Sequence, residues 1–130
     1  MKIRVLLVDD NLEFRQTTER FLANLPDVEC AGSAANGLEA IKAVLSLNPD
    51  LVLMDIVMPR MNGFEATREI KRLIDSPRII MLSLYNSDAY RQYAKQVGAD
   101  DFLPKSELIT GLETLISKLF ASDAFLKAHE

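Results

Sequence analysis

Short hydrophobic runs alternate with segments of helical periodicity along the chain. The runs fall at residues 3–8, 28–31, 51–55, 78–83 and 101–103. Between and after them, apolar residues recur every three or four positions, which is typical of helices with one buried face. The pattern predicts five strands alternating with five helices.

The predicted helices begin and end at recognisable signals. Asn11 can cap the first helix, Asn48-Pro49 ends the second, and Gly98 stops the fourth. We expect a small-residue loop over 32–36, between the second strand and the second helix. The residues expected to face the core are Phe14, Thr18, Phe21, Leu22 and Leu25; then Leu38, Ile41, Val44 and Leu45; then Ala66, Thr67, Ile70, Leu73 and Ile74; and finally Leu108, Leu112, Leu115, Ile116 and Leu119.

Regular alternation with short connections predicts an α/β fold. Strands this apolar are typical of a parallel sheet with helices on both faces. We therefore expect a flavodoxin-like, doubly wound, five-stranded parallel sheet of order 2-1-3-4-5. No repeat or interior linker interrupts it, so one domain is predicted over 1–121, with 122–130 as a tail or the start of a linker.

Composition narrows the functional classes. The chain has 130 residues, 48% hydrophobic and 26% charged, as in ordinary globular domains. Its net charge of −4 disfavours direct binding to nucleic acid. No apolar run nears the roughly 20 residues that span a bilayer, so we expect no membrane contact and a cytoplasmic location. Cys30 is interpreted as a buried small hydrophobe, with a reactive thiol as the alternative, and His129 as a solvated residue.

Asp55 ends the most central apolar run. Open α/β sheets place their chemistry at the carboxyl ends of the strands. Asp9 and Asp10 end the first strand in the same way, so all three carboxylates should converge at the point where the strand order reverses. Such a cluster favours Mg²⁺, a hard cation that prefers oxygen ligands. The alternatives are that Asp55 caps a turn and that Asp9-Asp10 is an exposed strand end.

Two further polar residues are expected at the same edge. Lys105 follows the fifth strand and Ser83 ends the fourth. Each alone is unremarkable on a surface. Together with Asp55 as nucleophile and Mg²⁺, they form a set suited to phosphoryl transfer, which depends on positioning and charge stabilisation.

Four stretches of the sequence resemble the receiver domain of two-component response regulators. They are residues 8–10, residues 53–59 with Gly63, residues 82–83 and residues 98–105. The resemblance covers roughly 3–120, and all four stretches occur in order at predicted strand ends. It implies a phospho-accepting signalling module rather than an enzyme, of the receiver type often joined to a helix-turn-helix DNA-binding domain.

The resemblance also implies residue roles. Asp55 would accept a phosphoryl group from the phosphohistidine of a sensor histidine kinase or a histidine phosphotransfer protein. Asp10, Asp55 and the backbone carbonyl of Val57 would bind Mg²⁺, while Asp9 would act mainly through water. Lys105 would offset charge at the phosphoryl group.

The resemblance further implies a conformational switch formed by Ser83 and Phe102, whose hydroxyl and ring would move together. Plain core packing is the alternative for Phe102.

The chain departs from the usual receiver pattern at Pro104-Lys105-Ser106, because relatives usually have Lys followed by Pro with a cis bond. Without Pro in that place, a cis peptide after Lys105 is doubtful.

The signal is expected to leave through the fourth helix, fifth strand and fifth helix, by a phosphorylation-dependent homodimer or another partner. Tyr85, Tyr90 and Tyr93 lie on or near that face, although Tyr90 and Tyr93 could equally be packed against the sheet.

Two other functional classes compete with the receiver interpretation. A small-molecule phosphohydrolase would need a second Asp where Val57 stands, and a pseudo-receiver would lack an acidic or Lys position.

Overall fold

The computed structural model describes residues 2–128, with side chains described from 2 to 121. The chain alternates strands and helices as its hydrophobic pattern predicts. The elements are β1 (Ile3–Val8), α1 (Leu12–Ala23), β2 (Val28–Ala34), α2 (Gly37–Leu47), β3 (Leu51–Asp55), α3 (Gly63–Lys71), β4 (Arg78–Ser83), α4 (Asp88–Gln96), β5 (Asp101–Pro104), the short 3₁₀ helix η1 (Lys105–Glu107) and α5 (Leu108–Ala128).

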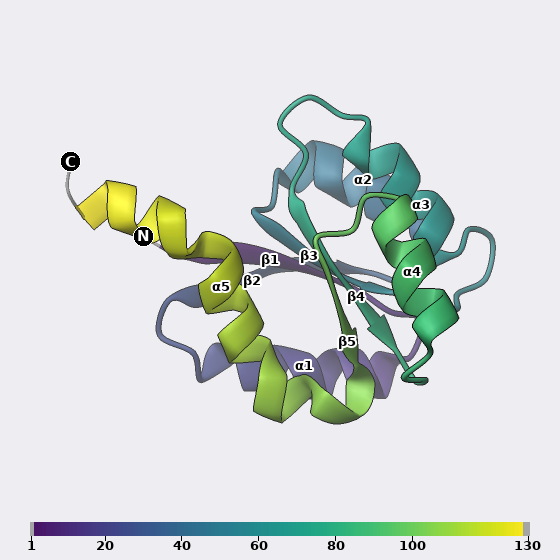
Figure 1. Ribbon diagram of the computed structural model, residues 1–130, viewed down its shortest axis with the longest axis horizontal. Helices are drawn as coiled ribbons and strands as arrows, with labels where there is room; N and C mark the ends of the chain where they lie inside the picture. Colours follow the sequence, from purple (N-terminus) through teal and green to yellow (C-terminus); the bar gives the residue numbers. More distant parts are fainter. Residues whose placement is uncertain (1, 129–130) are drawn as a thin grey trace.

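Within the described residues the strands form one parallel sheet of order β2-β1-β3-β4-β5 (Figure 1). The predicted fold class and strand order are confirmed. All of β3 is buried, as a strand covered by helices on both faces requires. Because the strands run parallel, their carboxyl ends meet along one edge of the sheet.

Two hydrophobic clusters lie on the two faces of the sheet. One joins α2, α3 and α4 to one face, and the other joins α1 and α5 to the opposite face (Figure 1). Alternate residues of each buried strand point into the two clusters, as the period of two in a strand dictates. In β3, for example, Val52 and Met54 belong to the first cluster, whereas Leu51 and Leu53 belong to the second.

Polar side chains fix where four of the helices begin. Asn11, Asn36, Asn62 and Ser87 each accept a hydrogen bond from the backbone N–H three residues ahead. The predicted cap at Asn11 is confirmed. The predicted stop of α4 is also confirmed, because Gly98 follows the helix with φ +99°, a conformation that glycine adopts without strain.

The second strand is longer than the sequence pattern predicts. The predicted strand ended at residue 31 and gave way to a loop over 32–36, but β2 extends to Ala34. Its register with β1 shifts between Val5 and Leu6, which leaves Ala31 unpaired, and pairing then continues to Val8 and Ala34. A bulge of this kind inserts one extra residue without ending the pairing, so β2 stays at the edge of the sheet as far as Ala34.

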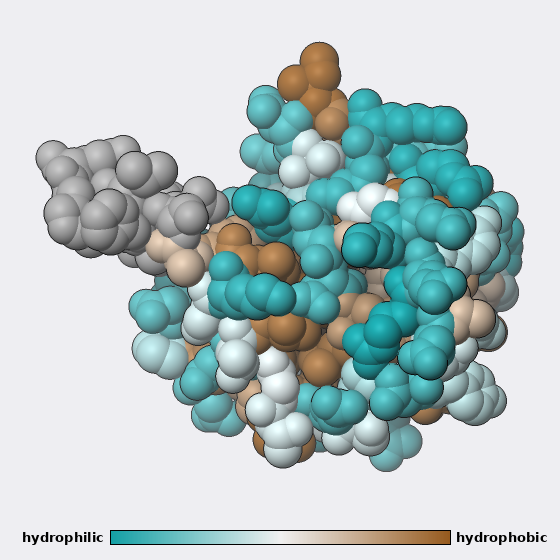
Figure 2. All heavy atoms as spheres, in the orientation of Figure 1, coloured by the Kyte–Doolittle hydropathy of each residue, from teal (hydrophilic) through white to brown (hydrophobic). Residues whose placement is uncertain are grey.

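Three residues predicted to face the core are exposed instead. Leu38 and Leu45 of α2 are 45% and 65% exposed, because Ala40 and Val44 occupy the inward face of that helix. Ile74 is 93% exposed, because α3 ends at Lys71 and leaves Ile74 on the loop before β4. Figure 2 shows brown apolar atoms projecting from this loop at the top of the molecule.

Several smaller predictions can be compared with the structure. Cys30 is half-buried on β2 with a free thiol, and burial raises the pKa of that thiol. Every peptide bond within the described range is trans, which agrees with the doubt about a cis bond after Lys105. His129 lies outside the described residues. None of the described helices is long and apolar enough to cross a membrane.

Candidate functional site

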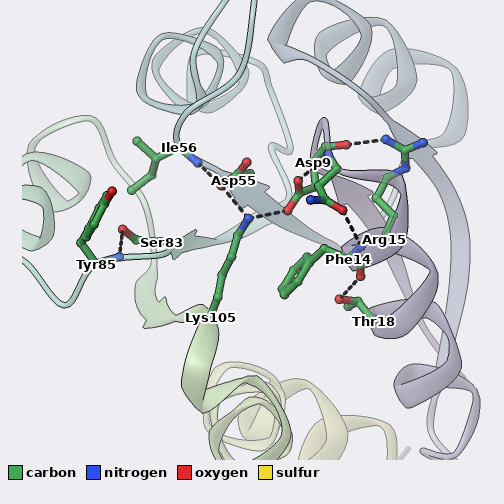
Figure 3. A network of polar contacts seen from close by, with 10 residues as sticks. Asp9, Phe14, Arg15, Thr18, Asp55, Ile56, Ser83, Tyr85 and Lys105 are labelled. Carbon is green, nitrogen blue, oxygen red and sulfur yellow. Dashed lines mark hydrogen bonds and ion pairs between the residues drawn. The ribbon is translucent and has the colours of Figure 1, made fainter.

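The expected polar residues converge at the carboxyl edge of the sheet. Asp9 follows β1, Asp55 ends β3 and Ser83 ends β4, while Lys105 opens η1 directly after β5. Because Val8 pairs with Met54, the residues that follow these two positions leave neighbouring strands side by side. Figure 3 shows Lys105 reaching from its helix across to Asp9 and Asp55.

The three aspartates form one oxygen-rich cluster. One carboxylate oxygen from each of Asp9, Asp10 and Asp55 lies within 4.8 Å of the others. Asp9 and Asp55 are buried, whereas Asp10 is exposed and can approach an ion from the solvent side. Carboxylates held this close repel one another unless a cation lies among them. The donor set therefore fits Mg²⁺, which takes oxygen ligands and keeps several waters.

Lys105 supplies a positive charge next to the buried carboxylates. Its Nζ lies 2.7 Å from Asp9 Oδ2 and 3.2 Å from Asp55 Oδ1. Burial by itself lowers the pKa of the ammonium group. The hydrogen bond to Asp9 and the charges of both aspartates outweigh that effect and raise the pKa of Lys105 above its ordinary value. Lys105 therefore remains a cation at neutral pH.

Asp55 is held in an unfavourable environment for a carboxylate. Burial and the neighbouring charge of Asp9 raise the pKa of Asp55 from 3.8 to about 6, although Lys105 and the N–H of Ile56 partly offset both effects. Ile56 donates its hydrogen bond to Asp55 Oδ1 at 2.9 Å. At pH 7 Asp55 is ionised, so the metal-free protein carries the free-energy cost of a buried, repelled charge.

Replacing Asp55 with Asn should therefore stabilise the metal-free protein. Between about pH 4 and pH 6 the unfolded chain releases a proton that folded Asp55 retains, so this group lowers the free energy of unfolding as pH rises through that window. Above pH 6 the deficit is constant. We expect Asp55→Asn to raise the free energy of unfolding by about 1–3 kcal/mol at pH 7.5 and much less at pH 4.

Urea unfolding in the presence of a chelator, at both pH values, measures this difference. Asp75→Asn is the matched control, because Asp75 is exposed on the loop before β4 and the substitution is the same. Equal stability of native and Asp55→Asn protein at pH 7.5 would contradict the expected cost of the ionised carboxylate.

Ser83 presents a hydroxyl at the same edge. It is buried, and its Oγ accepts a hydrogen bond from the backbone N–H of Tyr85 at 3.0 Å. Since the oxygen acts as acceptor there, the hydroxyl proton is free to be donated to another group. Ser83, Asp55 and Lys105 all line one open cleft of about 340 Å³.

Phe102 is placed differently from the other predicted site residues. Its ring is buried and does not line the cleft. The guanidinium of Arg91 in α4 covers it, with Cζ 4.6 Å from the ring centroid, and Arg91 Nη2 donates a hydrogen bond to Asn86 Oδ1 at 2.7 Å. The ring packs in the core cluster that joins α2, α3 and α4 to the sheet, and the switch role of Phe102 stays a prediction.

The cleft also contains residues that sequence reasoning did not assign to it. The unassigned residues of the cleft wall are Asn11, Phe14, Ile56, Leu84 and Tyr85. Val57, whose carbonyl was expected to bind metal, lines the cleft beside Ile56. Phe14 was predicted only as a core residue of the first helix. Its one sequence signal was its place four residues after Asp10, one helical turn from the carboxylates.

Comparison with known proteins identifies relatives over most of the chain. Residues 5–127 match the family described as response regulator receiver domain. The protein-glutamate methylesterase/protein-glutamine glutaminase of Alkalilimnicola ehrlichii is 42% identical over 107 residues, which are 81% of this chain and 27% of that protein. The transcriptional regulatory protein LiaR of Bacillus subtilis is 39% identical over 104 residues, covering 80% of this chain and 49% of LiaR.

The fold agrees with that relationship. A LuxR-family two-component response regulator from Aurantimonas sp. SI85-9A1 superimposes with a TM-score of 0.88 at 29% identity, covering 94% of this chain and 87% of the other. The curated relatives are longer proteins, of which this chain spans from about a quarter to about a half.

Proposed function

This chain belongs to the receiver domain family of two-component response regulators, and we propose that Asp55 is the residue on which it accepts the phosphoryl group. One observation carries the assignment. The Asp55 carboxylate lies in an open cleft beside both a second buried carboxylate and the ammonium group of Lys105. This is the arrangement that a phosphoryl-accepting nucleophile requires, since charge must be offset on the incoming group.

The transfer forms one bond and breaks one. A carboxylate oxygen of Asp55 bonds to phosphorus while the bond between phosphorus and the donor's histidine nitrogen breaks, and the imidazole leaves with the electron pair. Lys105 pairs with one phosphoryl oxygen from its position 3.2 Å from Asp55. Ser83 donates its hydroxyl proton to another oxygen. The chain thereby assists its own phosphorylation, and the same groups assist the later dephosphorylation.

The residues that would hold Mg²⁺ are Asp10, Asp55 and the carbonyl of Val57, with Asp9 acting mainly through water. When bound, Mg²⁺ supplies positive charge that offsets the repulsion among the carboxylates and the phosphoryl oxygens. Their oxygen-only chemistry and their spacing within 4.8 Å support this assignment for the three aspartates. Val57 lines the same cleft two residues after Asp55, which supports a role for its carbonyl.

Phosphorylation would reach the rest of the domain through Ser83 and Phe102. A hydroxyl drawn toward the phosphoryl group leaves its bond with Tyr85 N–H, and the loop between β4 and α4 can then move. We propose that the output surface is formed by α4, β5 and α5 and that it supports a homodimer. Tyr85 is 63% exposed near it, whereas Tyr90 and Tyr93 both pack against the ring of Phe64 in α3.

The proposal also covers the phosphoryl donor and the target that phosphorylation controls. The donor is a sensor histidine kinase or a histidine phosphotransfer protein, and phosphorylation controls a partner, a dimer or an attached output domain. The names of two relatives, a transcriptional regulatory protein and a methylesterase, describe longer proteins. The boundary at residue 121 and the cytoplasmic location stay predictions; α5 itself continues to Ala128.

Intact-mass measurement after treatment with acetyl phosphate and Mg²⁺ tests the proposed function. We expect one added phosphoryl group in the native chain and none when a chelator removes the metal, because the carboxylate cluster needs a cation. Sedimentation velocity of the same samples checks the dimer. A chain that gains no phosphoryl group and also forms no beryllofluoride complex would be a pseudo-receiver, and the proposal would be wrong.

A further inference from the structure

We infer that Phe14 is a positioning residue that holds the Lys105 ammonium group in the cleft by a cation–π contact. Lys105 Nζ lies 4.4 Å from the centroid of the Phe14 ring (Figure 3). This inference rests on the proposed function, because it assigns Lys105 to the phosphoryl group. It gives a role in the cleft to Phe14, whose side chain carries no charge and no hydrogen-bonding group.

The contact completes the surroundings of the ammonium group. Lys105 Nζ has two carboxylate partners, Asp9 and Asp55, and the side chain is only 10% exposed. The Phe14 ring is a further neighbour on its other side. The face of an aromatic ring attracts a cation within about 6 Å, more strongly where water is excluded. A buried ammonium group beside a ring at 4.4 Å meets both conditions.

The backbone that carries the ring is fixed at the start of its helix. The backbone N–H of Phe14 donates to the cap residue Asn11 at 2.9 Å, and its carbonyl accepts from Thr18 Oγ1 at 2.8 Å. The N–H of Asn11 in turn donates to Asp9 Oδ1 at 2.8 Å. The backbone of Phe14 and the Asp9 carboxylate are therefore linked through Asn11 at the start of α1.

The ring matters most when Mg²⁺ is bound. Mg²⁺ would share Asp55 with Lys105 directly and Asp9 through water. A bound cation would therefore weaken the attraction of both carboxylates for the ammonium group and repel it directly. The attraction of the Phe14 ring does not depend on those charges. It can keep Lys105 facing the cleft at the stage when the phosphoryl group arrives and needs it.

Ordinary packing is the competing explanation, since Phe14 also contacts the core cluster between α1, α5 and the sheet. Two substitutions separate the roles. Phe14→Leu keeps an apolar side chain but removes the ring, whereas Phe14→Tyr keeps the ring. Phe21→Leu is the matched control, because Phe21 packs against the same cluster from the same helix and makes no cation contact with any described side chain. If Phe14→Leu fails to fold, Phe14→Met provides a more adaptable replacement.

The first measurement is the NMR shift of the Lys105 ε-methylene protons. In the native protein with Mg²⁺ we expect these protons to be displaced by the ring current of Phe14. Phe14→Leu should return them to ordinary lysine values, while Phe21→Leu should leave them displaced. This readout depends on the ring itself, so a general loss of packing would not reproduce it.

The second measurement is the phosphorylation rate at saturating acetyl phosphate and Mg²⁺. Phe14→Leu should slow it by about three- to tenfold, the factor that a cation–π contact supplies, with Mg²⁺ affinity unchanged. Phe14→Tyr should restore the rate. If the native chain takes up no phosphoryl group, the proposed function and this inference both fail. If it is modified but the Leu and Tyr variants react alike, or the native lysine protons are not displaced, only this inference fails.

Discussion

Asp55→Asn is expected to abolish the phosphoryl adduct completely. The amide cannot act as the nucleophile, and the substitution barely changes the volume at a site that is buried. Since Asp55→Asn also removes the repelled charge, the variant should fold at least as well as the native protein at pH 7.5. The loss of the adduct would therefore report chemistry rather than unfolding. Intact mass after acetyl phosphate and Mg²⁺ measures it.

The control for this experiment is again Asp75→Asn, which should carry one phosphoryl group as the native chain does. Two other carboxylates, Asp9 and Asp10, lie beside Asp55 and could accept the group in its place. An adduct that persists in Asp55→Asn would show that one of them is the acceptor. Peptide mapping of that species would then identify which one, and the assignment of Asp55 would be wrong.

Gly63→Ala should unfold or severely weaken the domain. A Cβ at Gly63 would lie 2.0 Å from the backbone oxygen of Asp55 and 3.0 Å from the Cα of Ile56. These are backbone atoms of the segment that presents Asp55, and Gly63 N–H also donates to Ile56 O at 2.8 Å. Neither side can move without displacing the end of β3 or the start of α3. We expect a loss of at least about 3 kcal/mol in the free energy of unfolding.

Gly111→Ala is the matched control, because it adds the same methyl group in α5. There the new Cβ would meet Leu103 Cδ1 at 3.2 Å, the end of a side chain that can turn aside. Alanine also favours a helix over glycine by about 1 kcal/mol, so the net change should be small. Urea unfolding of both variants measures the contrast. Equal midpoints would mean that the close approach at Gly63 is easily relieved.

The sequence predicted the fold because its hydrophobic pattern is unambiguous. Strands such as β3 and β4 are apolar throughout, and only a parallel sheet covered on both faces buries such strands. The aspartates and Ser83 were found for a related reason: each polar residue interrupts or ends an apolar run. Parallel topology then places all those ends at one edge, as the structure confirms.

The sequence failed where burial depends on how an element is rotated or where it stops. Leu38 and Leu45 match helical spacing, yet the smaller Ala40 and Val44 face the sheet because α2 packs close to it. Ile74 continues the pattern of α3 beyond its last turn. Periodicity shows that a helix has an apolar face, but it does not decide between two overlapping faces or fix the last helical residue.

The sequence by itself therefore determined the order of the strands, the edge that carries the chemistry and the identity of its charged groups. Only the tertiary structure decided how those groups are balanced. It places Lys105 between Asp9 and Asp55, raises the pKa of Asp55 to about 6, and brings the ring of Phe14 against the ammonium group. Those properties depend on distances and burial across elements far apart in the chain, and local sequence patterns carry neither.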